Sequence, residues 1–144
     1  MPNLAHDPKW QRANTLFEGS KNGADIALVG VPAFKTCLSK SSANLTPAAI
    51  RTALSRYSTY SGTDEIELNG LAFSDLGDIA NPDHEDGEKR VATFLADVRE
   101  NYKLLIALGG DNSITYSVTA GLWPDLSKIG LITLDAHHDL RDGI

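Results

Sequence analysis

The chain has 144 residues, of which 42% are hydrophobic and 22% charged. This size and composition predict one globular domain and argue against disordered and fibrous proteins. A formal net charge of −6 argues against nucleic acid and anionic lipid as partners, since both need clustered basic residues. No apolar run approaches the roughly 20 residues that span a bilayer, and the N-terminus lacks a secretory pattern, so a cytoplasmic protein is expected.

Short apolar runs alternate with amphipathic stretches along most of the chain. Residues 1–24 are polar and predict an N-terminal arm, and residues 25–144 form the predicted domain. Continuous apolar runs bounded by glycine or polar residues are typical of buried strands. Such runs occupy residues 26–29, 71–76, 104–108 and 129–134.

Three helices are predicted between these strands. Thr46 before Pro47 indicates a helix start with the Thr46 hydroxyl as cap. The apolar faces predicted for the three helices are Ile50, Ala53, Leu54 and Tyr57; Val91, Phe94, Leu95, Val98 and Tyr102; and Ile114, Val118 and Leu122. Alternating strands and helices predict an α/β fold with three layers, α/β/α, and a mostly parallel sheet.

Two polar clusters directly follow apolar runs, at residues 109–113 and 135–139. Ligands of open parallel sheets gather at the carboxyl ends of the strands, so both clusters are expected at one edge. In an extended segment Asp135, His137 and Asp139 would point to the same side. Carboxylate and imidazole donors at this spacing predict a site for Mn²⁺, Zn²⁺ or Fe²⁺. The alternative is that these acids cap a helix or solvate a loop.

The other polar residues of the two clusters have less defined roles. His138 is expected to face away from the three donors and to pack beside them, unless the loop turns it inward. Gly109 and Gly110 permit a sharp turn that brings Asn112 towards the same edge. The Asn112 amide oxygen is a candidate metal ligand, and capping of the following helix is the alternative. No glycine-rich nucleotide-binding motif is present in the sequence.

The two clusters resemble motifs of the arginase, agmatinase and formimidoylglutamase superfamily, the Mn²⁺-dependent ureohydrolases. Residues 109–114, GGDNSI, are similar to the family segment G-G-D-H-S-I, and residues 135–139, DAHHD, are similar to its D-A-H-x-D signature. Weaker likenesses lie at residues 26–32, 46–51 and 75–78, which resemble an early strand ending in G-V-P, a G-P-x-A-I-R helix start and a D-x-G-D segment.

The resemblance implies an arginase-like fold, a binuclear Mn²⁺ centre, a small amidine or guanidine substrate and assembly into homo-oligomers. It assigns metal binding to Asp135, His137 and Asp139, and a catalytic role to Asp139 in orienting the metal-bound hydroxide. Asn112 stands where the family has a metal-binding histidine, which is a departure from the pattern.

The resemblance also suggests the substrate. Arg141 lies two residues after the signature, at a position that faces substrate in relatives that recognise a carboxylate, and a guanidinium suits that group. The pattern D-A-H-x-D-x-R favours a formimidoylglutamase over an agmatinase or arginase. Arg141 and His138 are therefore the candidate substrate-binding residues, and a surface Arg141 paired with Asp142 is the alternative.

The chain has about half the length expected of this superfamily, whose second half supplies further metal-binding acids. The sheet is therefore expected to be incomplete at its C-terminal end. A fragment, one product of a split protein and a non-catalytic remnant that binds metal or a partner all remain open interpretations.

Overall fold

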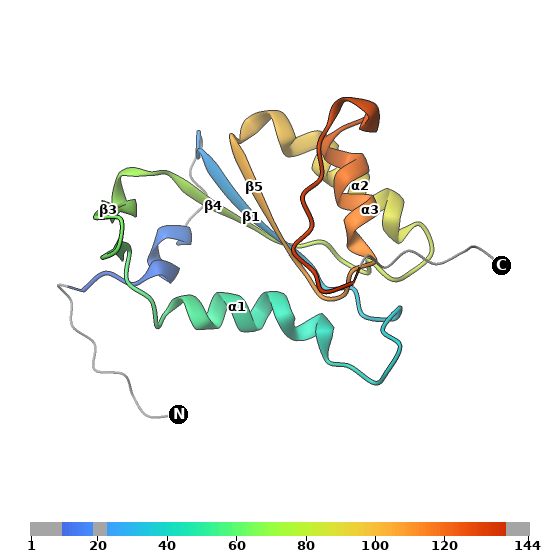
Figure 1. The fold of residues 1–144 in the computed structure, drawn as a ribbon, viewed down its shortest axis with the longest axis horizontal. Coiled ribbons are helices and arrows are strands. Elements are labelled where there is room, and N and C mark those ends of the chain that lie inside the picture. Colours follow the sequence, from blue (N-terminus) through green and yellow to red (C-terminus); the bar gives the residue numbers. More distant parts are fainter. Residues whose placement is uncertain (1–9, 19–22, 138–144) are drawn as a thin grey trace.

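The computed structural model describes residues 10–18 and 23–137. Within these residues the main sheet has three parallel strands in the order β4, β1, β5 (Figure 1). They are β1 (Ile26–Val31), β4 (Phe73–Asp78) and β5 (Leu104–Gly109). Ile26 lies opposite Phe73 on one side and Leu104 on the other, so the three strands begin level and end at one edge. The predicted parallel sheet is confirmed.

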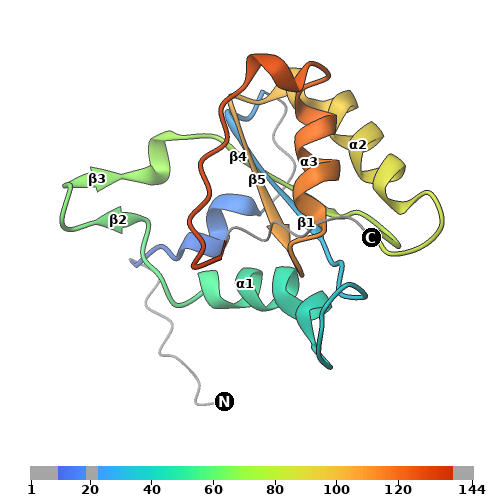
Figure 2. The ribbon, with the colours of Figure 1, turned by 45° about the vertical axis from the view of Figure 1, so that its right-hand side comes forward.

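Helices cover both faces of this sheet (Figures 1 and 2). One face carries α1 (Thr46–Leu54) and a 3-10 helix, η1 (Ala13–Phe17), and the other carries α2 (Gly87–Val98) and α3 (Ile114–Leu122). The three-layer prediction is therefore confirmed for the described part of the chain. The shorter elements are η2 (Ala43–Leu45), β2 (Tyr60–Ser61), β3 (Ile66–Glu67), η3 (Leu68–Gly70), η4 (Arg99–Asn101) and η5 (Leu126–Lys128), with β2 and β3 paired antiparallel.

The main hydrophobic core lies between the sheet and the helices α2 and α3. Val29 and Val31 of β1 pack there with Val91 and Leu95 of α2, and all four are at most 1% exposed. The predicted faces of α2 and α3 supply further partly buried side chains, namely Phe94, Ile114, Val118 and Leu122. The spacing of apolar residues thus predicted correctly which sides of these helices face the sheet.

The helix α1 departs from its predicted face. Its N-cap residue is Leu45, no side chain caps it, and Thr46 already lies inside the helix. Ile50 is 36% exposed and Tyr57 is 64% exposed, so the predicted apolar stripe only partly faces the sheet. The polar Arg51 instead reaches the sheet from this helix, because two carboxylates of β4 lie opposite it.

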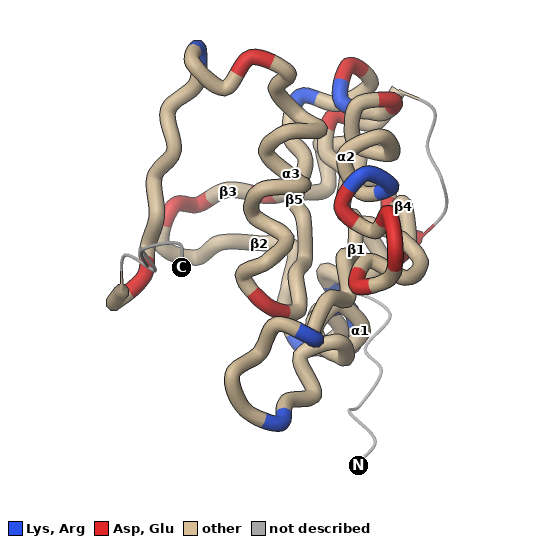
Figure 3. Tube along the Cα trace, turned by 90° about the vertical axis from the view of Figure 1, so that its right-hand side faces the viewer, with Lys and Arg blue, Asp and Glu red and all other residues tan. Residues whose placement is uncertain are grey.

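The predicted strand at residues 129–134 does not form in the described chain. Leu131, Ile132 and Leu134 are 67%, 88% and 96% exposed, and the segment leading to the C-terminus lies apart from β5 in Figure 3. A strand requires a neighbouring backbone to pair with its N–H and C=O groups. Among the described residues β5 pairs with β1 alone, so residues 129–134 do not pair with its other edge. The segment is apolar, but it is neither a strand nor buried in the structure, so this prediction was wrong.

The described part of the N-terminal region packs on the α1 side of the sheet. Ala13 and Leu16 of η1 are buried, and the Phe17 ring meets the Phe73 ring edge-on with centroids 5.1 Å apart. The boundary between an arm at residues 1–24 and the domain stays a prediction.

The helices of the described residues do not have the length and apolar composition that a membrane span requires.

Candidate metal site

Three loops meet at the carboxyl edge of the sheet, where the sequence predicts the functional site. Residues 32–37 follow β1, residues 79–86 follow β4 and residues 110–113 follow β5. Together they line an open cavity of about 430 Å³, to which Lys35 and Thr36, Asp83 and His84, and Ser113 contribute from the three loops in turn. The edge is therefore concave, as expected for a ligand site in a parallel sheet.

Asp111 connects two of these loops through both oxygens of its carboxylate. Oδ2 accepts hydrogen bonds from the Thr36 hydroxyl at 2.8 Å and the Thr36 N–H at 3.3 Å. Oδ1 accepts hydrogen bonds from the Ser113 N–H at 3.1 Å and the Ser113 hydroxyl at 2.5 Å. Burial raises the pKa of the Asp111 carboxyl, but the hydrogen bonds from Ser113 and Thr36 outweigh burial and lower the pKa below its ordinary value of 3.8. Asp111 therefore remains an anion at neutral pH.

Asn112, the candidate ligand in this loop, lies directly between Asp111 and Ser113. Its side chain is exposed at the edge, and its carbonyl oxygen accepts a hydrogen bond from the Thr115 N–H at 3.1 Å as α3 begins. The structure therefore places Asn112 at the predicted edge of the sheet. Its role as a metal ligand stays a prediction.

Asp135 and His137 are brought together, but by a bend rather than by the predicted extended segment. The His137 N–H donates to Asp135 Oδ1 at 2.8 Å, and His137 Nδ1 lies 3.7 Å from the same oxygen. The His137 side chain is 81% exposed, so its ring nitrogens are accessible. A carboxylate and an imidazole so close together fit the donor chemistry of Mn²⁺.

The structure describes two of the predicted metal ligands besides Asp135, namely Asn112 and His137. His138, Asp139 and Arg141 lie outside the described residues. Among residues 10–18 and 23–137, no group of three or more His, Cys, Asp or Glu side chains is arranged to hold a metal ion. The four-residue metal set of Asn112, Asp135, His137 and Asp139 stays a prediction, as do the substrate contacts of His138 and Arg141.

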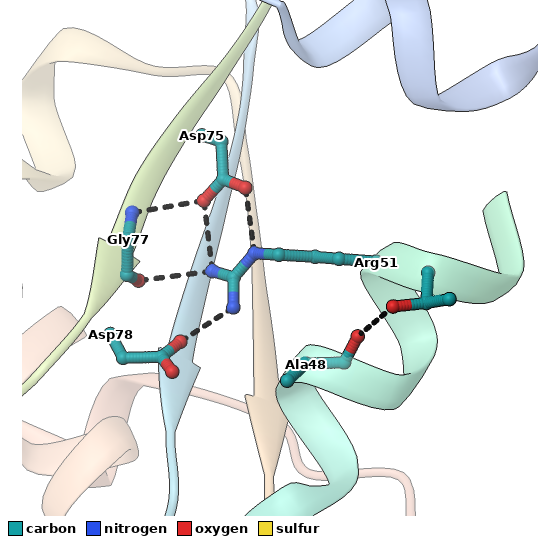
Figure 4. Close-up of polar contacts among 6 residues, drawn as sticks. Ala48, Arg51, Asp75, Gly77 and Asp78 are labelled. Atoms are coloured by element: carbon teal, nitrogen blue, oxygen red, sulfur yellow. Dashed lines mark hydrogen bonds and ion pairs between the residues drawn. The ribbon is translucent and has the colours of Figure 1, made fainter. Parts of the chain in front are cut away.

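A second polar cluster, to which the sequence assigned no role, joins α1 to the carboxyl end of β4 (Figure 4). Arg51 donates to both oxygens of Asp75, at 2.6 Å from Nε and 2.8 Å from Nη2, and it also reaches Asp78 and the Gly77 carbonyl. A Cβ at Gly30 would overlap the Asp78 carboxylate, so glycine leaves the space that this side chain occupies.

This arrangement shifts the pKa values of Asp75 and Arg51 in opposite directions, and both shifts favour the charged pair. Burial raises the pKa of the Asp75 carboxyl, but hydrogen bonds from Arg51 and the Gly77 N–H outweigh burial and lower it. The hydrogen bond to Asp75 is the largest of the effects that raise the pKa of Arg51. The acids of residues 75–78 were noticed in the sequence only as part of a weak family likeness. The spacing of these acids in the sequence does not indicate that they bind a side chain of another element.

The described residues form an α/β domain whose three parallel strands end at one concave edge, the place expected for a ligand site. The sequence model of the family described as "Arginase family" matches residues 24–143. The chain belongs to the arginase family.

The comparisons also include curated relatives and solved structures. A formimidoylglutamase of Halalkalibacterium halodurans is 36% identical over 121 residues, covering 81% of this chain and 38% of that protein. Agmatinases and an arginase match as well. The chain thus spans about two fifths of the length of these curated relatives.

The solved structures show the same fold. The formimidoylglutamase of Bacillus subtilis superposes with a TM-score of 0.71 at 27% identity, covering 84% of this chain and 40% of that one. A Trypanosoma cruzi formiminoglutamase solved with Mn²⁺ superposes with a TM-score of 0.69 at 23% identity, covering 78% of this chain and 39% of that one. The described sheet and helices are therefore part of an arginase-type fold.

Proposed function

We propose that this chain supplies one part of a binuclear Mn²⁺ site in a hydrolase that cleaves C–N bonds of linear amidines, with N-formimidoyl-glutamate as its substrate. The observation that carries the proposal is the contact between Asp135 and His137 within the D-A-H-x-D signature. Similarity to formimidoylglutamases, and a neighbouring formiminoglutamase solved with Mn²⁺, support it.

The residues divide into metal ligands and substrate contacts. Asp135, His137 and Asp139 would hold the two ions, together with Asn112 from the loop after β5. When bound, the ions would lower the pKa of a bound water and supply a hydroxide nucleophile at neutral pH. Asp139 would accept a hydrogen bond from the nucleophile through a carboxylate oxygen and so direct it at the amidine carbon.

The substrate preference rests on Arg141 and His138. The guanidinium of Arg141 would pair with a substrate carboxylate through two parallel hydrogen bonds, which an ammonium group cannot reproduce. His138 would contact the substrate beside it. Addition of water to N-formimidoyl-glutamate and cleavage of its C–N bond give glutamate and formamide.

The experiment measures product release by the intact protein, purified at the length its own cell makes and loaded with Mn²⁺. Formamide is measured with N-formimidoyl-glutamate, and urea is measured with agmatine and arginine. We expect formamide release that a chelator removes and Mn²⁺ restores. Asp139→Asn should abolish turnover, and Arg141→Lys should raise KM for N-formimidoyl-glutamate more than it lowers kcat.

An agmatinase is the second candidate within the same chemistry, because an agmatinase of Pyrococcus horikoshii is 34% identical to this chain. Agmatine has no carboxylate, so urea release that is insensitive to Arg141→Lys would favour this candidate over the first.

Absence of turnover on all three substrates would reject both hydrolase candidates. A metal- or partner-binding role without turnover would then be tested with the double variant Asp135→Asn, His137→Asn. Unchanged binding of Mn²⁺ or of a partner would reject that role too.

A further inference from the structure

The pairing of β1 with β5 continues past the ends of both strands. The Gly110 N–H donates to the Val31 carbonyl at 3.2 Å, and the Asp111 N–H donates to the Ala33 carbonyl at 3.0 Å. A Cβ at Gly110 would overlap the Ala33 carbonyl oxygen, so only glycine allows this close approach. The backbone leading to Asn112 is therefore fixed against the loop after β1.

The Asp111 side chain extends this connection in both directions. One carboxylate oxygen holds Thr36 in the loop after β1, and the other holds Ser113, the residue before α3. Asn112 lies between the two residues that this carboxylate joins, and its own carbonyl is held by the Thr115 N–H. Its backbone thus has fixed neighbours on both sides, while its side chain is exposed at the edge.

We propose that Asp111 is a positioning residue that holds Asn112 in the place from which its amide oxygen reaches one metal ion, and that it ties this place to the loop after β1 through Thr36. The inference rests on the proposed Mn²⁺ site. Groups that orient metal ligands contribute strongly to affinity, because a ligand that must be ordered on binding costs conformational entropy.

The loop after β1, at residues 32–37, is also held by a second carboxylate, and this contact provides a matched control. Asp83, in the loop after β4, accepts a hydrogen bond from the Phe34 N–H at 2.9 Å, and Lys35 Nζ donates to the Asp83 carbonyl at 3.4 Å. Both Asp83 and Asp111 therefore hold the loop at residues 32–37, but only Asp111 is also bonded to a neighbour of Asn112. Asp83→Asn should loosen the loop without moving Asn112.

The experiment measures Mn²⁺ binding to the intact protein by the electron paramagnetic resonance signal of free Mn²⁺, which gives the number of bound ions and their dissociation constants. Asp111→Asn should weaken the binding of one of the two ions by about 10- to 100-fold, the range found for groups that orient metal ligands. The second ion should bind as before, since general damage to the fold would weaken both. Asp83→Asn should leave both constants unchanged.

A double-mutant cycle tests whether Asp111 acts through Asn112. In an Asn112→Ala background, Asp111→Asn should weaken Mn²⁺ binding no further. An equal loss in both backgrounds would overturn the proposal, as would equal binding by Asp111→Asn and the wild type. Ser113→Ala removes one hydroxyl donor and leaves the carboxylate in place. Ser113→Ala should weaken the binding of the same ion by a smaller factor, and it replaces Asp111→Asn in the test if that variant does not fold.

These outcomes separate the two proposals. If the wild-type protein binds Mn²⁺ and the Asp111 variants bind it equally well, the positioning role alone is refuted. A wild-type protein that takes up no Mn²⁺ refutes the metal site, and the positioning role with it.

Discussion

Replacing Arg51 with methionine should destabilise the protein measurably, because this side chain joins α1 to β4. The guanidinium makes two hydrogen bonds to Asp75 and one to Asp78, and the Arg51 and Asp75 side chains are only 22% and 24% exposed. Arg51→Met keeps much of the apolar stem but leaves the Asp75 carboxylate half-buried and without its cation.

The magnitude comes mainly from Asp75. Hydrogen bonds to charged groups contribute about 1.5–3 kcal/mol, whereas the Asp78 carboxylate is 41% exposed and its pair with Arg51 is screened by solvent. We therefore expect Arg51→Met to lower the free energy of unfolding by roughly 2–3 kcal/mol. Arg51→Lys keeps the charge but cannot bind both Asp75 oxygens in parallel, so its loss should be smaller but still measurable.

The assay is urea unfolding of the intact protein, read from the midpoint at constant slope. A cycle with Asp75→Asn isolates the pair, and its coupling energy should exceed about 0.5 kcal/mol. A loss below about 0.5 kcal/mol for Arg51→Met, the range of ordinary surface substitutions, would refute this reasoning.

Three further predictions follow from the pKa of Asp75, the donor at Asn112 and the core at Leu95. The folded-state pKa of Asp75 is lowered, so its stabilising contribution is present above its ordinary value of 3.8 and lost as pH falls below it; urea midpoints of the wild type and Asp75→Asn should converge in that acidic range. Asn112→His places a stronger transition-metal donor beside Asp111 and should tighten Mn²⁺ binding at one ion, seen as a lower dissociation constant in the same resonance titration. Leu95→Ala empties a fully buried position and should cost about 2–5 kcal/mol in urea unfolding.

The sequence predicted the strands of the sheet and the faces of two helices because local patterning decides them. The continuous apolar run of β1 is buried as predicted, whereas the equally apolar run of β5 forms its strand but is only partly buried. The spacing of Val91 and Leu95, and of Ile114 and Val118, follows the helical repeat, and these residues meet the sheet as predicted.

Features that depend on a distant partner could not be predicted in the same way. Residues 129–134 have the composition of a buried strand, but nothing in a strand pattern shows which backbone will pair with it. The sheet-facing side of α1 was misjudged for the same reason, since Arg51 faces inward only because Asp75 and Asp78 lie across from it.

The candidate site depends both on local sequence patterns and on distant partners. The identities of its donor residues were therefore easier to predict than their geometry. Asn112 lies between Asp111 and Ser113, which a hydrogen bond joins, and its carbonyl accepts a hydrogen bond from the Thr115 N–H. Because the β1–β5 pairing ends at Asp111, the position of Asn112 at the edge follows from the strand that precedes it. Asp135 and His137 follow residues 129–134, whose apolar side chains remain exposed, and a local hydrogen bond sets their bend. The identities of the donors follow from the motif, but residues 129–134 pair with no strand among the described residues, so the sequence pattern alone does not fix the distance of Asp135 and His137 from Asn112.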